Sequence, residues 1–114
     1  MKLLLVEDEP ALLSLLERYL GRLGYEVAGC GTRAEAAAVF EQGGFAIAVI
    51  DLTLPDGSGE ELAKGFVAST PGLKVLFTSG HPSAPTGVPG SVFLQKPFWP
   101  GALGEALAGL GVSR

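Results

Sequence analysis

The sequence is poor in the side chains that most often carry metal and nucleophile chemistry. Its 114 residues include one cysteine, Cys30, and one histidine, His81. A single cysteine excludes an internal disulfide framework and is compatible with a reducing compartment, so we expect a cytoplasmic location. It also excludes a zinc site built from several thiolates, and one histidine leaves little for histidine ligation.

Long hydrophobic runs and an excess of positive charge are missing too. The opening run Leu3–Val6 stops at Glu7, which is too short for a signal-peptide core or a membrane span, so we expect no membrane association. Eight basic and twelve acidic residues give a net charge of −4, which argues against direct nucleic-acid binding. The hydrophobic fraction of 47% argues against disorder, and the length predicts one domain, residues 1–114.

Short apolar runs alternate with helical patterns along the chain. The most hydrophobic run, Phe45–Ile50, shows no alternation of polar and apolar residues. Both of its faces should therefore be buried, as in the centre of a parallel sheet. Five strands are predicted, at Lys2–Val6, Tyr25–Ala28, Phe45–Ile50, Leu73–Thr78 and Ser91–Gln95.

Helical signals fill most of the segments between these strands. Thr32 with Glu35, and Ser58 with Glu61, have the spacing of capping boxes that begin two helices. The order predicts an α/β fold, a doubly wound parallel sheet with helices on both faces. Apolar residues at helical spacing mark the first helix (Leu12, Leu16, Tyr19, Leu20 and Leu23) and the last (Leu103, Leu107 and Leu110).

Polar residues stand where the predicted strands end. Glu7 and Asp8 follow the first strand, Asp51 the third, Thr78–Ser79 the fourth and Lys96 the fifth. The carboxyl ends of parallel strands share one edge of the sheet, so these groups should converge. Three neighbouring acids repel one another, so they need a cation or a raised pKa, and oxygen ligands favour Mg²⁺. A lysine and a hydroxyl suit a phosphoryl group, which a carboxylate can accept. The pattern predicts Mg²⁺-assisted phosphoryl transfer to Asp51.

With these residues in place, the sequence resembles the receiver domain of two-component response regulators, particularly the single-domain chemotaxis type. The resemblance covers essentially the whole chain. It implies a flavodoxin-like sheet of five strands in the order 2-1-3-4-5. It also implies a phosphoacceptor with Mg²⁺-dependent autophosphorylation and autodephosphorylation, not a turnover enzyme. Four segments at predicted strand ends carry it: Leu4–Glu9, Val49–Gly59, Val75–Gly80 and Phe93–Phe98.

The resemblance also implies a role for each site residue. Asp51 matches the phosphoacceptor, which also binds the metal, and Asp8 matches the acid that binds Mg²⁺ directly. Glu7 matches the acid that reaches the metal through water, and Thr53 would give its backbone carbonyl. Lys96 matches the lysine that pairs with a phosphoryl oxygen, and the following peptide bond to proline is typically cis. The implied partners are a histidine kinase or phosphotransfer protein and an output protein that the sequence does not identify; nor does it indicate the oligomeric state.

Two adjacent hydroxyls compete for the role of the switch residue. Neighbours on a strand point to opposite faces, so only one of Thr78 and Ser79 should face the site. The family places its hydroxyl directly before a small residue, which favours Ser79 before Gly80. Phe93, three residues before Lys96, matches the switch aromatic, with a plain core role as the alternative. Phosphorylation would then alter the surface from the fourth strand to the last helix.

The sequence departs from the family between Gly80 and Ser91. Three prolines and two glycines occupy the place where receivers carry their fourth helix. A proline in a helix interior costs about 3 kcal/mol, and no apolar face offsets that cost here. We expect this helix to be missing or reduced to a turn, which puts the usual dimer face in doubt. Trp99 is expected to pack close to the site.

Two other functions stay open. A phosphohydrolase with an aspartyl intermediate would need a second acid two residues after Asp51, where Thr53 stands. A phosphorylation-independent protein-interaction module with the receiver fold is harder to separate, because the altered fourth-helix region belongs to the surface that reads out the switch. Flavin binding is disfavoured, since Glu7 and Asp8 would repel a phosphate group after the first strand.

Overall fold

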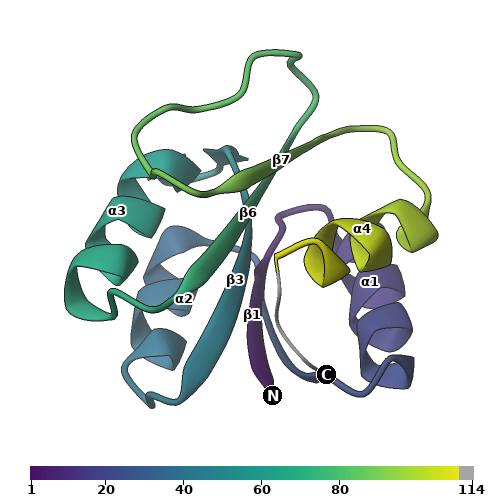
Figure 1. Ribbon diagram of the computed structural model, residues 1–114, viewed down its shortest axis with the longest axis horizontal. Coiled ribbons are helices and arrows are strands. Elements are labelled where there is room, and N and C mark those ends of the chain that lie inside the picture. Colours follow the sequence, from purple (N-terminus) through teal and green to yellow (C-terminus); the bar gives the residue numbers. More distant parts are fainter. Residues whose placement is uncertain (111–114) are drawn as a thin grey trace.

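The computed structural model describes residues 1–110 and has a five-stranded parallel sheet at its centre (Figure 1). The strand order is β2-β1-β3-β6-β7, and every neighbouring pair is parallel. Counted without a small separate hairpin, this is the predicted flavodoxin-like order 2-1-3-4-5. The strands are β1 (Lys2–Val6), β2 (Glu26–Cys30), β3 (Phe45–Asp51), β6 (Lys74–Ser79) and β7 (Val92–Gln95).

Helices cover both faces of the sheet, as expected for parallel strands joined by crossovers. Helices α1 (Pro10–Arg22) and α4 (Pro100–Ala108) lie on one face, and α2 (Arg33–Phe40) and α3 (Gly59–Ser69) on the other (Figure 1). Each strand divides its apolar side chains between two cores. In β3, for example, Val49 belongs to the core under α1 and α4, whereas Ile50 belongs to the core under α2 and α3.

The connection between β3 and α3 contains a small hairpin. Strand β4 (Thr53–Leu54) pairs antiparallel with β5 (Gly57–Ser58). Gly57 has a φ of +139°, a backbone conformation that residues with a side chain rarely adopt. The second strand also differs from its prediction: it begins at Glu26 and continues to Cys30, because its pairing with β1 extends that far.

Both predicted caps form at the helix N-termini. The Glu35 amide donates to Thr32 Oγ1 at 3.1 Å, and the Glu61 amide donates to Ser58 Oγ at 3.2 Å. The reciprocal half of each capping box is absent among the described residues. Instead, the Glu35 carboxylate accepts from the Gly31 amide at 3.1 Å, and the Glu61 carboxylate pairs with Lys64.

No helix forms between β6 and β7 in the described chain, which confirms the missing fourth helix. Residues 81–90, which we call the strap, cross above α3 instead (Figure 1). The Gly87 amide donates to Glu60 Oε2 at 2.8 Å, and Val88 is buried in the core under α2 and α3. The strap is thus fixed, near its own carboxyl end, to the first turn of α3. Within residues 1–110, no helix is long and apolar enough to cross a membrane.

Candidate functional site

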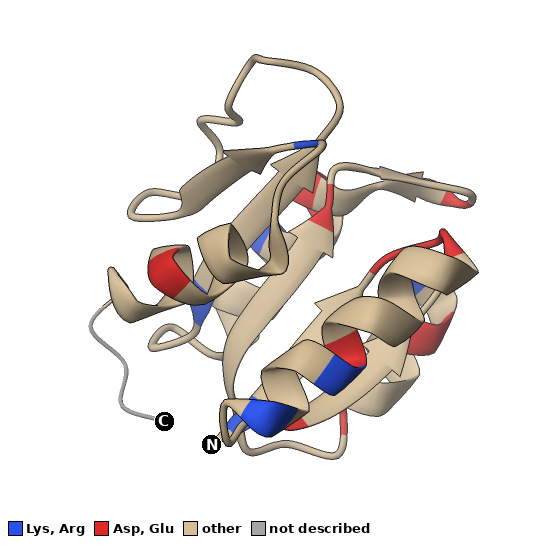
Figure 2. Cartoon of the chain, turned by 90° about the vertical axis from the view of Figure 1, so that its right-hand side faces the viewer, with Lys and Arg blue, Asp and Glu red and all other residues tan. Residues whose placement is uncertain are grey.

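The predicted site residues do meet at the carboxyl ends of the strands. Glu7 directly follows β1, Asp51 is the last residue of β3, and Lys96 directly follows β7. The Lys96 ammonium nitrogen lies 2.6 Å from Glu7 Oε1 and 2.7 Å from Asp51 Oδ2. The lysine therefore bridges two carboxylates that come from the first and third strands. Figure 2 shows acidic and basic positions together at the upper end of the sheet.

Three carboxylates form the acidic centre of the site. Oxygen atoms of Glu7, Asp8 and Asp51 all lie within 4.8 Å of one another. Glu7 and Asp51 are buried, and Asp8 is exposed. When all three are ionised, Lys96 balances only one of the negative charges. An oxygen-only donor set with uncompensated charge and an opening to solvent fits a hard divalent cation.

Burial and the lysine act in opposite directions on the protonation of the site. Burial raises the pKa of Glu7, although the Lys96 hydrogen bond and the Glu9 amide oppose this shift. For Lys96, burial favours the neutral form, but the hydrogen bonds to Asp51 and Glu7 outweigh it and the pKa is raised overall. The lysine is therefore a cation at neutral pH and the natural counter-charge for the two buried acids.

Local backbone contacts fix the orientation of the Asp51 carboxylate. The Thr53 amide donates to Asp51 Oδ1 at 3.1 Å, while Lys96 occupies Oδ2. Gly59, the first residue of α3, packs directly against the backbone of Asp51. A Cβ atom at this position would overlap the Asp51 carbonyl oxygen. The Gly59 amide donates to the Leu52 carbonyl at 3.0 Å. This bond closes residues 52–59, which we call the acceptor loop.

The two candidate switch hydroxyls are both buried at the end of β6. Thr78 is the register partner of Asp51, and register partners in a parallel pair share a face of the sheet. Ser79 lies one residue further: its carbonyl accepts from the Lys96 amide at 2.7 Å, and its hydroxyl accepts from the His81 amide at 3.0 Å. Alternation along the strand thus does not by itself select Ser79, and the assignment stays a prediction.

Of the predictions for Phe93 and Trp99, the first stays open and the second is wrong. Phe93 is half-buried against the core under α2 and α3, so a packing role is present and a switch role stays a prediction. The expectation that Trp99 packs is wrong, because 83% of its surface is exposed. It is the N-cap residue of α4 and has extended backbone angles, so its side chain lies outside the packed helix. The Lys96–Pro97 peptide bond is cis, as the resemblance implied.

Two tethers near the site were not predicted from the sequence. Asp56, at the tip of the β4–β5 hairpin, accepts hydrogen bonds from the Arg33 and Ala34 amides of α2. Glu60 accepts from Gly87 of the strap. In each case the partner lies more than twenty residues away in sequence, so no local pattern reports the contact. The sequence shows the acidic residues Asp56 and Glu60, but nothing close to them in sequence indicates their partners.

The sequence profile described as the response regulator receiver domain matches residues 3–108. The chain belongs to this family. This receiver domain is 31% identical over 112 residues to the response regulator protein PilR of Pseudomonas aeruginosa, covering 94% of this chain and 25% of PilR. It is 32% identical over 110 residues to the transcriptional regulatory protein GlrR of Escherichia coli, covering 92% and 25%. The chain thus spans about a quarter of these relatives.

Solved receiver structures agree with the fold. A CheY-like receiver domain from Methanospirillum hungatei superposes with a TM-score of 0.86 at 30% identity, covering 96% of this chain and 93% of that one. The non-phosphorylated HemR receiver domain from Leptospira biflexa gives a TM-score of 0.87 at 30% identity, with coverages of 99% and 96%. Receiver domains are regulatory phosphoacceptors, not turnover enzymes, and the acidic trio of this chain is consistent with the Mg²⁺ site of the family.

Proposed function

We propose that residues 1–114 form one receiver domain that takes a phosphoryl group on Asp51 and passes the signal to an output protein. The observation that carries this is the contact of Lys96 with both Asp51 and Glu7, at 2.7 and 2.6 Å, beside the exposed carboxylate of Asp8. The donor would be a histidine kinase or phosphotransfer protein in the cytoplasm. Direct contact with nucleic acid is not part of the proposal, given the net charge of −4.

The reaction forms an acyl phosphate on Asp51. A carboxylate oxygen attacks phosphorus, the bond from phosphorus to the donor breaks, and the donor leaves with the electron pair of that bond. With acetyl phosphate the leaving group is acetate; with phosphohistidine it is an imidazole, which takes up a proton. Lys96 would then pair with the negatively charged phosphoryl oxygens. Attack by water later restores the carboxylate and releases inorganic phosphate.

The acidic trio would also hold the divalent cation. Asp8 and Asp51 would bind it directly, Glu7 through water, and Thr53 through its carbonyl. Bound Mg²⁺ supplies positive charge that offsets repulsion between the acids and an incoming phosphoryl group. The trio supports this proposal because it presents oxygen donors only, with one carboxylate open to solvent.

The readout proposed is a change of surface at the strand ends. The new phosphoryl group would draw in the Ser79 hydroxyl, which in the resting chain accepts from the His81 amide, and Phe93 would move with it. A ligand shifts such an equilibrium only by its differential contacts. Here those contacts are the hydroxyl and Lys96. The surface affected runs from β6 through the strap to α4.

Intact mass after incubation with acetyl phosphate tests the proposal. We expect one phosphoryl adduct that requires Mg²⁺ and is absent from Asp51→Asn. Ser79→Ala and Thr78→Val, tested alongside, separate the two hydroxyls, because only the switch residue should uncouple modification from the surface change seen by hydrogen exchange. A folded, Mg²⁺-saturated chain that takes no adduct would instead support a phosphorylation-independent interaction module, which the missing fourth helix keeps as the second candidate.

A further inference from the structure

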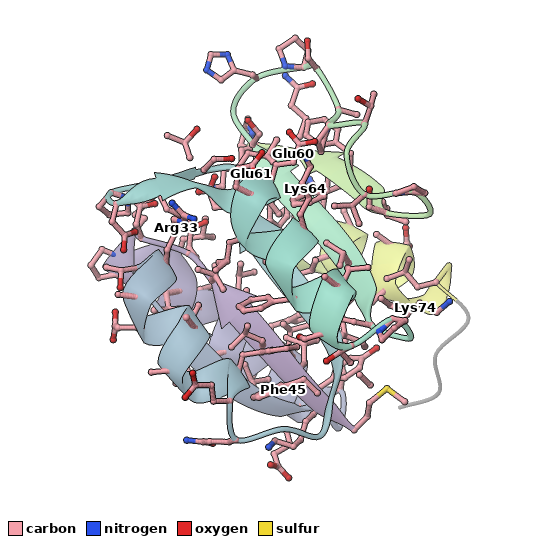
Figure 3. All side chains as sticks on the ribbon, turned by 90° about the vertical axis from the view of Figure 1, so that its left-hand side faces the viewer. Arg33, Phe45, Glu60, Glu61, Lys64 and Lys74 are labelled. Atoms are coloured by element: carbon pink, nitrogen blue, oxygen red, sulfur yellow. The ribbon has the colours of Figure 1, made fainter. Side chains whose placement is uncertain are left out.

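A carboxylate at the tip of the β4–β5 hairpin ties the acceptor loop to helix α2. Asp56 Oδ1 accepts from the Arg33 amide at 2.8 Å, and Oδ2 accepts from the Ala34 amide at 3.1 Å. Arg33 Nη1 also donates to the Asp56 carbonyl at 3.4 Å. Figure 3 shows Arg33 between the hairpin and the start of α2. Hydrogen bonding, first of all from the Arg33 amide, keeps the pKa of Asp56 below its ordinary value.

Helix α2 does not need Asp56 in order to begin. Thr32 already caps it, since Oγ1 accepts from the Glu35 amide and the Thr32 carbonyl accepts from the Ala36 amide. Asp56 receives only the first two amides, and both contacts are exposed. Water can satisfy exposed amides at little cost. The tie therefore matters more for the hairpin than for the helix.

The hairpin carries groups that belong to the site. Thr53 of β4 faces Ser58 of β5, and the Thr53 amide holds Asp51 Oδ1 at 3.1 Å. Directly after the hairpin, Gly59 packs on the Asp51 backbone. Any displacement of the hairpin thus moves Thr53 and the Asp51 carboxylate together.

The tie also spans the strand that supplies the other two acids. Strand β1 lies between β3 and β2 in the sheet, and the Glu7 amide donates to the Cys30 carbonyl at the end of β2 at 2.9 Å. The hairpin leaves β3, and α2 follows β2. The Asp56 contact therefore links the two sides of the segment that carries Glu7 and Asp8.

We propose that Asp56 is a positioning residue of the divalent-cation site. By fixing the hairpin against α2, it holds Thr53 and Asp51 in register with the acids that follow β1. Asp56 touches neither the cation nor the phosphoryl group in this proposal; it acts through Thr53. The inference rests on the proposed Mg²⁺-dependent function.

Mg²⁺ titration of the whole chain, followed by calorimetry, tests this role. Partners of metal ligands typically affect metal affinity about 10- to 100-fold, and Asp56 is one step further removed. We therefore expect Asp56→Ala to bind Mg²⁺ roughly three- to tenfold more weakly than the parent. Asp56→Asn, which keeps one acceptor oxygen, should fall between the two. Glu41→Ala removes the same charge at the other end of α2 and should bind like the parent.

The thermal midpoint without Mg²⁺ separates positioning from a merely structural role. We expect it to change little in both Asp56 variants, because the freed amides are exposed. Unchanged Mg²⁺ affinity in a folded Asp56 variant would overturn the inference, whatever its midpoint. If the parent chain itself bound no Mg²⁺, the proposed function would fail first, and this result is visible before any variant is made.

Discussion

Lys96 is the one basic side chain near the acidic trio in the described chain that contacts two of its members. Its side chain is 22% exposed, whereas those of Glu7 and Asp51 are 3% and 7% exposed. Removing one partner of a buried ion pair costs about 3–5 kcal/mol, and partial exposure of the lysine reduces this. Lys96→Met should therefore lower the free energy of unfolding at pH 7 by roughly 2 kcal/mol.

That loss should depend on pH in a defined direction. Without the lysine, the pKa of Glu7 rises further above its ordinary value, and the folded state then binds more protons than the unfolded state. Stability of Lys96→Met should therefore recover as the pH falls toward 5. Urea unfolding at pH 7 and pH 5 measures this, with Lys64→Met as the control because the Lys64–Glu61 pair is exposed. Equal losses at both pH values would contradict the prediction.

Burial lowers the reactivity of the Cys30 thiol. Burial, followed by the nearby Glu35 and Glu17 carboxylates, raises the pKa of the thiol to about 11. We expect no alkylation by iodoacetamide at pH 8 in the native chain and full alkylation in guanidinium chloride, both read by intact mass. Because the folded state keeps its proton longer, the thiol contribution to stability should decline as the pH rises from about 9 to 11. Rapid native alkylation would argue against this environment.

Gly59 is required by contact distance, not by backbone angle. Gly59→Ala would push a methyl group into the Asp51 carbonyl, and overpacking of this kind costs about 1–3 kcal/mol. We expect that loss in chemical unfolding, together with slower phosphoryl acceptance. Gly65→Ala is the matched control in the same helix, since a Cβ there meets nothing within 4 Å, and helix propensity predicts a gain of about 1 kcal/mol. Similar effects of both changes would refute the contact argument.

The strap, at the scale of elements, is held to α3 by the Gly87–Glu60 hydrogen bond and to the core by buried Val88. Glu60→Ala removes the acceptor of the Gly87 amide, and a net hydrogen bond is worth about 1 kcal/mol. Amide exchange in residues 81–90 should therefore become roughly three- to tenfold faster. Glu60→Gln keeps an acceptor and should exchange more slowly than Glu60→Ala. Glu61→Ala, which breaks only the exposed pair with Lys64, should leave the strap unchanged; faster exchange there would indicate general loosening of α3.

The elements were predictable to the extent that they follow from local patterns. Apolar runs predicted all five strands of the sheet, and Thr32 and Ser58 marked two helix starts, because these signals depend on near neighbours. Proline in the strap excluded a helix for the same reason. The Asp56 contact with α2 and the Glu60 contact with the strap depend on which distant segments the fold brings together. Trp99 was misjudged because an aromatic residue in a connection carries no periodic signal.

The candidate site was predictable because strand ends in a parallel sheet share an edge. That rule predicts from the sequence that Glu7, Asp51 and Lys96 lie together, and their contacts agree. The rule does not decide between Thr78 and Ser79. Adjacent residues of a strand point to opposite faces of the sheet, and the rule does not say which face holds the switch hydroxyl. It also gave no information on exposure, which separates Asp8 from the buried Glu7.

For the whole molecule, cation binding and folding should be linked. A ligand that binds only the folded state stabilises it by about 2.7 kcal/mol at one hundred times its dissociation constant. We therefore expect the thermal midpoint to rise with Mg²⁺ concentration. Asp8→Asn should reduce this rise strongly, whereas Glu26→Gln, a change at an exposed acid of β2, should not. Differential scanning calorimetry measures the effect, and an equal rise in the Asp8 variant would place the cation elsewhere.

The composition of the strap also limits how it can meet another protein. Its ten residues include no lysine, arginine, aspartate or glutamate, and His81 is the only titratable side chain among them. Long-range electrostatic steering needs charge on both surfaces and weakens as ionic strength rises. Association through the strap would therefore proceed at an unsteered rate that salt hardly changes. Association of an acidic partner with Arg18 and Arg22 of α1, in contrast, would slow as salt is added.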